Sequence, residues 1–483
     1  MLKYKKAFRV LKNINSQNFL ITLFICIIFP YYVKAQVRQA FTLRGTTQST
    51  PYYEAETKLF NLKGDFLQIG NSNITTSKGN PNGENGNTKV SFNNTDNNPD
   101  VINSSSANLV FPETGCENEI VAAYLYWSGR ATKRMIASTN NGQNRLGGYI
   151  LSRTTGGSGN SGYVNFRFTG TNRTQYDFRL SRNGALAYRT AASGAYTSIT
   201  PTNTYTTGSG NSQKRFVEFS PIIMYDGNDY QIVISAVCRE YSESQSSSTA
   251  YVDIIYKANG NLLNKNTVKI KAENGTYEDI IAEPENSYYS ETADNHMYYS
   301  SAEITNIVKN AYSIYGNNTT YTVANIYAGQ SPDNYSDDDG TGFYGGWGIV
   351  VIYHNPSKKL KDIAIFNGFA YVYNDAGYYD ISLSGFRTVL NGAVGVDIGV
   401  MAGEGDYSID GDYLSIRQRN SNNFTTLSVP LSEGGNGNTN NYFHAYINGG
   451  TGDNRGITRN PSIRNNTGLD ISKISIPIMA TPL

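Results

Sequence analysis

Short segments in which apolar and polar residues alternate run through most of the chain, and this pattern limits the possible folds more than any other feature. Val164, Phe166 and Phe168 fall on one face of an extended segment, because successive side chains of a strand point to opposite faces. Tyr251–Lys257 and Thr267–Glu273 alternate in the same way. Such segments predict half-buried β-strands and therefore an all-β fold.

Runs rich in glycine and asparagine separate these segments. They include Ser77–Asn87, Gly156–Gly162, Thr206–Ser212 and Glu433–Asn441, and their residues favour turns. The segment Glu119–Trp127 is apolar on both faces, which is typical of a strand between two packed layers. Regular alternation of strands and turns predicts two packed β-sandwich-like regions, of jelly-roll or immunoglobulin-like type, with few short helices.

One helix is predicted, at Ser301–Ala311. Ile304 and Val308 begin an apolar stripe with the spacing of a helix face. Ser300 or Ser301 is the expected N-cap, because a serine hydroxyl can accept a hydrogen bond from the first turn.

The first 35 residues have the pattern of a secretory signal peptide. A basic region between Lys3 and Lys12 precedes the apolar stretch Phe19–Phe29, and Val33 and Ala35 suit a cleavage site before Gln36. The apolar stretch is shorter than the ~20 residues that a membrane-spanning helix needs. We therefore predict a secreted or cell-surface protein with no transmembrane span in the mature chain, with an uncleaved anchor as the alternative.

The remaining ~450 residues exceed what one hydrophobic core usually organises. Strand periodicity is lost and acidic residues accumulate within Glu278–Ser300. The sequence therefore predicts an N-terminal domain at residues 36–260, a connecting segment at 261–294 and a C-terminal domain at 295–483.

Charge and cysteine content restrict the partners and the compartment. The net charge is +1 and only 16% of residues are charged, so there is no electrostatic reason to expect a nucleic-acid partner. Cys26 lies within the predicted signal peptide, which leaves Cys116 and Cys238. Each lies beside a strongly apolar segment, and we predict that the two can meet and form a disulfide in an oxidising compartment. Two separately buried thiols are the alternative.

Gly340, Gly342 and Gly345 have the spacing of a dinucleotide-binding loop. That loop must follow a strand and lead into a helix whose N-terminus faces the pyrophosphate. Here the order is reversed, because the apolar run Trp347–Tyr353 predicts a strand directly after the glycines. The arrangement excludes a nucleotide loop and predicts a turn that enters a core strand.

Candidates for catalysis are few. The three histidines are His296, His354 and His444, and the sequence contains neither a G-x-S-x-G nor an H-E-x-x-H motif. Acidic residues gather in turns, whereas glycoside hydrolysis needs two carboxylates across a cleft. We predict no catalytic residues and no enzymatic activity, and a glycoside hydrolase or carbohydrate-binding module remains the alternative.

Two acidic turns could bind a metal ion. Calcium is held by several oxygen ligands, often carboxylates on loops, although aspartate is also an ordinary turn-forming residue. Neither turn matches the EF-hand pattern. The residues predicted as calcium ligands are Asp333, Asp337, Asp338 and Asp339 in the first turn, and Asp406, Asp410 and Asp412 in the second.

Tyrosine is abundant, with 38 tyrosines against two tryptophans. Flat aromatic rings can stack on sugars, and Asn286–Ser300 is the densest such segment. Tyrosine is also favoured in strands and tolerated at interfaces. Extracellular glycans or surface proteins are the expected partners.

Six segments carry a family resemblance: Leu62–Thr75, Asn103–Gly129, Tyr321–Gly329, Gly345–Pro356, Ile363–Val372 and Gly399–Asp406. Together they resemble the N-terminal region of large gliding motility-associated surface proteins of Bacteroidota. The resemblance spans most of residues 60–475. It implies a secreted, adhesin-like or structural surface protein, linked to gliding motility or attachment, and it supplies no catalytic residue.

Proteins of that family usually continue into repeated β-domains and end in a type IX secretion sorting domain. This sequence stops at Leu483, where the segment Gly468–Leu483 looks like the start of a strand. We therefore expect a truncated product or a fragment of a longer surface protein.

Overall fold

The computed structural model describes most of the chain after residue 35 and divides it into two compact units. One unit consists of Met1–Thr42 and Phe366–Ser384, and the other of Leu43–Ile365 and Gly385–Leu483. In the described residues, β1 (Gln36–Arg44) pairs with β27 (Ile365–Tyr371). The described ranges are 36–76, 90–98, 100–113, 118–130, 135–136, 144–146, 149–156, 163–169, 175–181, 185–189, 194–209, 214–226, 230–240, 248–258, 261–289, 297–329, 343–372, 379–385, 387, 393–403, 405–406, 409–417, 423–428, 439–448, 458–462 and 468–479.

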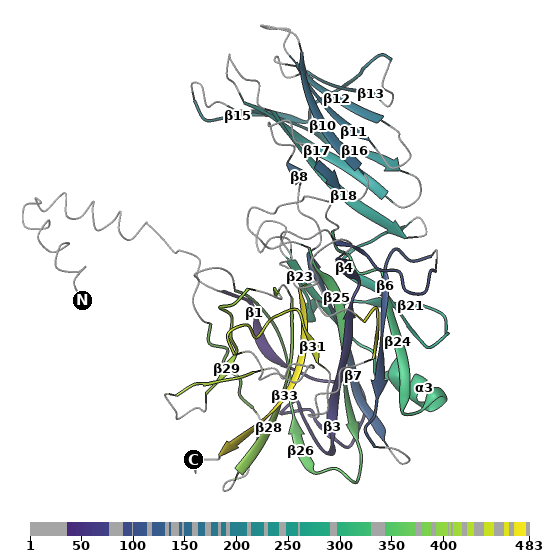
Figure 1. Cartoon of the computed structure of the whole chain (residues 1–483), viewed down its shortest axis with the longest axis vertical. Helices are drawn as coiled ribbons and strands as arrows, with labels where there is room; N and C mark the ends of the chain where they lie inside the picture. Colours follow the sequence, from purple (N-terminus) through teal and green to yellow (C-terminus); the bar gives the residue numbers. More distant parts are fainter. Residues whose placement is uncertain are drawn as a thin grey trace, which may run out of the picture. The chain divides into compact units, whose positions relative to one another are not determined.

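A seven-stranded sheet forms the centre of the second unit. Its order is β2-β3-β25-β7-β23-β22, with β26 beside β3, and β25 lies between β3 and β7 (Figure 1). Ile349 of β25 is opposite Ile69 on one side and Leu125 on the other. The strands are β2 (Tyr53–Glu54), β3 (Leu59–Ser72), β7 (Glu119–Arg130), β22 (Tyr288–Tyr289), β23 (Met297–Glu303), β25 (Gly345–His354) and β26 (Leu360–Ile363).

A five-stranded sheet packs against one face of this sheet. Leu67, Trp347 and Ile349 share a hydrophobic cluster with Ile270 and Val323 of the second sheet, and such burial is the main driving force for packing the two layers. The order is β21-β20-β24-β6-β32. The strands are β6 (Ser104–Val110), β20 (Thr267–Ala272), β21 (Glu278–Ile281), β24 (Asn318–Ala324) and β32 (Arg459–Asn460).

A three-stranded sheet packs on β3 and β25 through positions that have no side chain. A Cβ atom at Gly70 would lie 2.2 Å from the carbonyl oxygen of Trp347 and 2.3 Å from Cδ1 of Ile471, so only glycine allows this approach. The sheet has the order β28-β33-β31, with β28 (Ala393–Gly403), β31 (Ile447–Asn448) and β33 (Leu469–Met479). Apolar layers on both faces explain why β25 is almost continuously buried.

Two further antiparallel sheets come from the part of the chain between β7 and β20. Their orders are β14-β13-β12-β11-β10-β9 and β15-β16-β17-β18-β19, with β8 beside β18. The strands are β8 (Met135–Ile136), β9 (Asn144–Leu146), β10 (Tyr149–Gly156), β11 (Tyr163–Thr169), β12 (Gln175–Ser181), β13 (Leu186–Arg189), β14 (Thr197–Ile199), β15 (Asn203–Thr207), β16 (Lys214–Asp226), β17 (Tyr230–Glu240), β18 (Ser248–Ala258) and β19 (Asn261–Leu262).

Two short ribbons complete the strands. They pair β4 (Ile74–Thr76) with β5 (Val90–Phe92), and β29 (Ser415–Ile416) with β30 (Thr425–Thr426).

The predicted all-β fold is confirmed, whereas the strand pairing does not follow the predicted division at residues 261–294. Strands β3 and β7, from the predicted N-terminal domain, pair with β25 and β23, from the predicted C-terminal domain. The predicted connecting segment itself supplies β20, β21 and β22. Its acidic residues misled the prediction because an edge strand such as β21 is largely exposed and tolerates charge.

The predicted helix exists but begins later. It is α3 (Thr305–Tyr315), the one α-helix among the described residues, with Val308 and Ala311 buried. The predicted caps Ser300 and Ser301 are wrong, because both belong to β23 and pair with β7. Ile304 is the residue at the N-cap and gives no side-chain cap.

Candidate functional site

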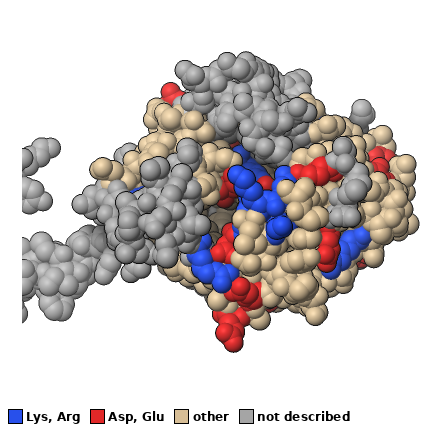
Figure 2. Space-filling model, turned by 90° about the horizontal axis from the view of Figure 1, so that it is seen from below, with Lys and Arg blue, Asp and Glu red and all other residues tan. Residues whose placement is uncertain are grey.

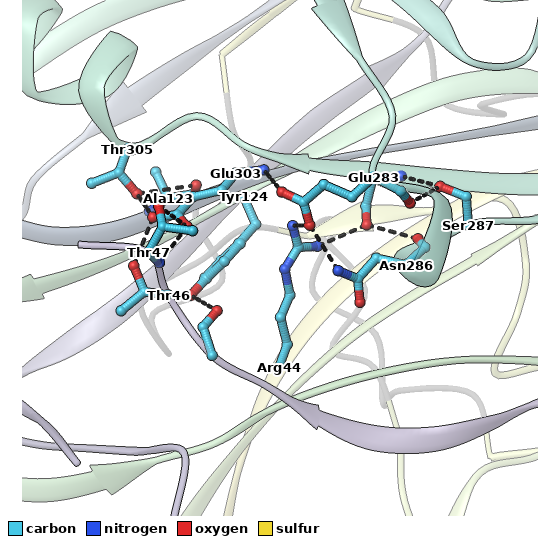
Figure 3. A network of polar contacts seen from close by, with 12 residues as sticks. Arg44, Thr46, Thr47, Ala123, Tyr124, Glu283, Asn286, Ser287, Glu303 and Thr305 are labelled. Carbon is cyan, nitrogen blue, oxygen red and sulfur yellow. Dashed lines mark hydrogen bonds and ion pairs between the residues drawn. The ribbon is translucent and has the colours of Figure 1, made fainter. Parts of the chain in front are cut away.

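A polar network at the end of β1 brings two glutamates and an arginine together (Figure 3). Arg44 ends β1, Glu303 ends β23, and Glu283 precedes the 3₁₀ turn η5 (Pro284–Asn286). The Arg44 side chain is almost fully buried, and its guanidinium lies 4.4 Å from the centroid of the Tyr124 ring. Residues far apart in the sequence therefore share one charged centre.

Glu283 joins Arg44 to the neighbouring strand. Nη2 of Arg44 donates to Oε2 of Glu283 at 2.7 Å, and the side chain of Asn286 donates to the same oxygen at 2.7 Å. The backbone N–H of Glu303 donates to Oε1 of Glu283 at 2.8 Å. Nη1 of Arg44 donates to the hydroxyl of Ser301 at 2.7 Å. Both oxygens of Glu283 are thus occupied.

Glu303 accepts hydrogen bonds from three threonines. The hydroxyls of Thr46 and Thr305 donate to Oε1 at 2.6 and 2.7 Å, and the backbone N–H and hydroxyl of Thr47 donate to Oε2 at 2.8 and 2.9 Å. Burial alone would raise the pKa of Glu303, but these donors outweigh it and hold the pKa below its usual value.

This network is suited to holding structure rather than to proton transfer. A general acid or base exchanges a proton with its substrate, whereas each oxygen of Glu303 already accepts two hydrogen bonds and Oε2 of Glu283 is paired with Arg44. The network fixes the segment from Arg44 to Thr47 against β23. Sequence patterns gave no sign of it, because Arg44 and Glu283 are 239 positions apart.

A second charged network joins strands of the seven-stranded and three-stranded sheets. Nζ of Lys361 lies 2.9 Å from Asp65 and 2.6 Å from Asp397. The nearly buried Lys473 donates to the carbonyl oxygen of Phe66 at 2.7 Å and lies 3.1 Å from Asp65. Figure 2, the view from below, shows basic and acidic side chains beside one another on this face of the molecule. Each carboxylate of this network has a lysine partner.

The predicted calcium residues divide between described and undescribed parts of the chain. Asp333, Asp337, Asp338 and Asp339 lie outside the described residues. Asp406, Asp410 and Asp412 are described, and Oδ1 of Asp412 accepts the backbone N–H of Phe443 at 2.8 Å. Burial raises the pKa of Asp412, although the N–H groups of Phe443 and Tyr442 lower it in part.

Asp470, which sequence patterns did not single out, lies near two of these aspartates. Its side chain is 4% exposed, and burial raises its pKa well above the usual value, with further increases from the charges of Asp412 and Asp406. Oδ1 accepts the backbone N–H of Tyr446 at 2.8 Å, but Oδ2 has no hydrogen-bond partner among the described residues.

His444 is close to Asp412 and is also nearly buried. Its Nδ1 lies 3.1 Å from the carbonyl oxygen of Tyr442, and its ring stacks on Tyr446 with centroids 5.2 Å apart. Burial lowers the pKa of His444, so the ring is neutral at pH 7. We call Asp412, His444 and Asp470 the buried acidic group.

Across the described ranges, no three histidine, cysteine, aspartate or glutamate side chains lie together in a way that would hold a metal ion. Calcium binding by either acidic turn therefore stays a prediction. The disulfide prediction also stays open, because Cys116 lies outside the described residues and only the backbone of Cys238, in β17, is described.

Comparison with known proteins gives no family assignment. No protein-family model, no curated protein and no solved structure matches the chain. No helix in the described part of the chain is long and apolar enough to cross a membrane. The function must therefore be argued from the residues themselves.

Proposed function

We propose that the protein is a non-enzymatic, exported surface protein of adhesin-like or structural type, with a role in attachment or gliding motility. The observation that carries this proposal is how the fold uses its acidic residues. At Glu283, Glu303 and Asp65, donors or cations of the chain itself occupy the carboxylates. These contacts stabilise the packing of strands, which a surface module under mechanical tension requires.

The signal-peptide pattern and the resemblance to gliding motility-associated proteins support the same proposal. A composition rich in asparagine, serine, threonine and glycine, with few charges, suits an extended β-structure outside the cell. Secretion through the type IX route and surface display are parts of this proposal.

Two assays test it. Proteolysis of intact cells of the source organism should degrade the protein without cell lysis, and beads coated with residues 36–483 should adhere to polysaccharide surfaces above beads coated with albumin. The same preparation should release no reducing sugar from a panel of polysaccharides. Turnover of any polysaccharide, or resistance to proteolysis until the cells are lysed, would overturn the proposal.

Carbohydrate binding without turnover is a second candidate function. The rings of Tyr413 and Phe424 are about half exposed on the β29–β30 ribbon, and exposed aromatic rings mark interaction sites more often than scattered aliphatic side chains do.

A further inference from the structure

The β29–β30 ribbon has one face in the core and one face in solvent. Ser415 pairs with Thr426, and Ile416 with Thr425. Leu414 and Ile416 pack against the hydrophobic cluster of Leu427, Tyr442 and Ile474. Because side chains alternate along a strand, the residues between and beside them point to the opposite face. We call Tyr413, Ser415, Arg417, Phe424 and Thr426 the outer ribbon face.

The outer ribbon face combines flat rings with polar groups. Tyr413 is 51% exposed and Phe424 is 48% exposed. The guanidinium of Arg417 lies 4.8 Å from the centroid of the Phe424 ring, a stacking distance that orients its donors along the ring. The hydroxyl of Ser415 donates to Oγ1 of Thr426 at 3.2 Å. Planar apolar surface therefore alternates with hydrogen-bonding groups over a short distance.

Arg417 differs in its charge balance from three other described arginines. Arg44, Arg189 and Arg387 each contact a carboxylate, whereas Arg417 has no carboxylate partner among the described residues. The sequence from Tyr413 to Ser428 contains two arginines and no acidic residue. The nearest described acid before it, Asp412, accepts a backbone hydrogen bond from Phe443. The outer ribbon face therefore offers an uncompensated positive charge.

We propose that the outer ribbon face binds an anionic polysaccharide, with uronic acid units as the recognised group. The apolar C–H face of a pyranose ring can pack on the flat rings of Tyr413 and Phe424. The fork of Arg417 fits a uronate carboxylate with two parallel hydrogen bonds. The hydroxyls of Ser415 and Thr426 suit sugar hydroxyls. This inference rests on the proposed surface function and gives it a ligand class.

A purely apolar occupant, such as a second copy of the chain, fits this face less well. Burying Arg417 against apolar surface without an anion would leave its charge unpaired, which is unfavourable. The rings are also separated by polar groups, whereas a stable protein interface has a contiguous apolar core.

The test measures binding of residues 36–483 to polygalacturonate by isothermal titration calorimetry, with dextran as a neutral glycan, heparin as a sulfated glycan and polyaspartate as a polyanion without sugar rings. We expect polygalacturonate to bind most tightly. Phe424→Ala should weaken binding about tenfold, the loss of about 1.4 kcal/mol. Arg417→Gln should weaken polygalacturonate binding by a similar factor and leave any dextran binding unchanged.

Matched controls use exposed residues elsewhere on the protein. Tyr315→Ala removes a ring that is 43% exposed on α3, and Lys359→Gln removes an exposed charge; both should leave binding unchanged. Equal affinity for polyaspartate, or unchanged binding in Phe424→Ala, would overturn the inference. If coated beads still adhere while polygalacturonate does not bind, the inference fails and the proposed surface function stands.

Discussion

Glu303 and Asp470 are two carboxyl groups of the same compact unit with opposite environments. Glu303 accepts four hydrogen bonds from threonines, and its pKa lies below the usual value. Asp470 is more deeply buried, accepts the backbone N–H of Tyr446, and has a pKa well above the usual value. Burial raises the pKa of both groups, but four donors offset it at Glu303, whereas at Asp470 the donors are fewer and the nearby Asp412 and Asp406 raise the pKa further.

The largest loss of stability is expected when Arg44 is removed from the network that contains Glu303. Arg44→Ala leaves Glu283 without its cation and Ser301 without its donor. Because Glu283 is 30% exposed, we expect a cost of about 3 kcal/mol, the low end of the range for breaking a buried ion pair. Unfolding in urea at pH 7 measures the change. Arg387→Ala is the matched control, because that arginine joins Glu54 and Asp362 on the surface. An equal decrease in the free energy of unfolding for both variants would contradict the larger contribution assigned to the buried Arg44.

Glu303→Gln should lower the free energy of unfolding by a smaller amount, and this decrease should depend on pH. A glutamine donates from one of the two positions that now accept, so the N–H of Thr47 or the hydroxyls lose a partner, at a cost of about 1 to 2 kcal/mol. Because the folded pKa of Glu303 is lowered, its stabilisation is present above the unfolded value of about 4.3 and is lost as the pH falls below it.

The measurement is the difference in free energy of unfolding between wild type and Glu303→Gln at pH 7 and at pH 3.5. The difference should shrink at the lower pH. Glu278→Gln, at an exposed position of β21, should show no difference at either pH. A constant difference would contradict the charged state assigned to Glu303.

Asp470→Asn should give the smallest change in the free energy of unfolding, and this change should be an increase. The folded pKa of Asp470 is raised, so the wild type loses stability as the pH rises above the unfolded value of about 3.9. The amide avoids this loss and can still accept from Tyr446. We expect a stabilisation of about 1 kcal/mol at pH 8, the usual cost of an unsatisfied buried polar group, and little change at pH 4.

The same variant sharpens the calcium prediction. With excess chelator, the melting temperature of Asp470→Asn at pH 8 should exceed that of the wild type. If added calcium raises the melting temperature of the wild type but not of Asp470→Asn, the ion binds at the buried acidic group, because a ligand stabilises the state that holds it. If added calcium changes the melting curve of neither protein, the prediction that Asp406, Asp410 and Asp412 bind calcium is wrong.

Local patterns predicted the strands well, since alternation and continuous apolar runs depend on nearby residues. Tyr251–Lys257 falls within β18, and the run Trp347–Tyr353 lies inside β25 with burial on both faces. The helix stripe was also correct, because Val308 and Ala311 face the core. Its start was not, because pairing of Ser301 with Tyr126 in a sheet outweighed the capping preference of serine.

Sheet order and both charged networks depend on contacts that no local pattern encodes. Asp406 and Asp412 were predicted as calcium ligands because they lie close together in a turn. Their buried neighbour Asp470 was not, because it is a single acid in an apolar segment. Likewise, Glu283 resembled a linker residue because its partner Arg44 lies in a different part of the chain. A single sequence contains no signal for such pairs.

The place of β25 has a consequence for the growing chain on the ribosome. Strands β3 and β7 are complete once Arg130 has been added, but β25, which lies between them, starts only at Gly345. Until then the nascent protein carries two long apolar strands with open edges, and such edges recruit other chains. For an exported chain the same holds after it has crossed the membrane: the interval between the arrival of residue 130 and that of residue 354 sets how long the unfinished protein is exposed to aggregation, whatever the stability of the completed sheet.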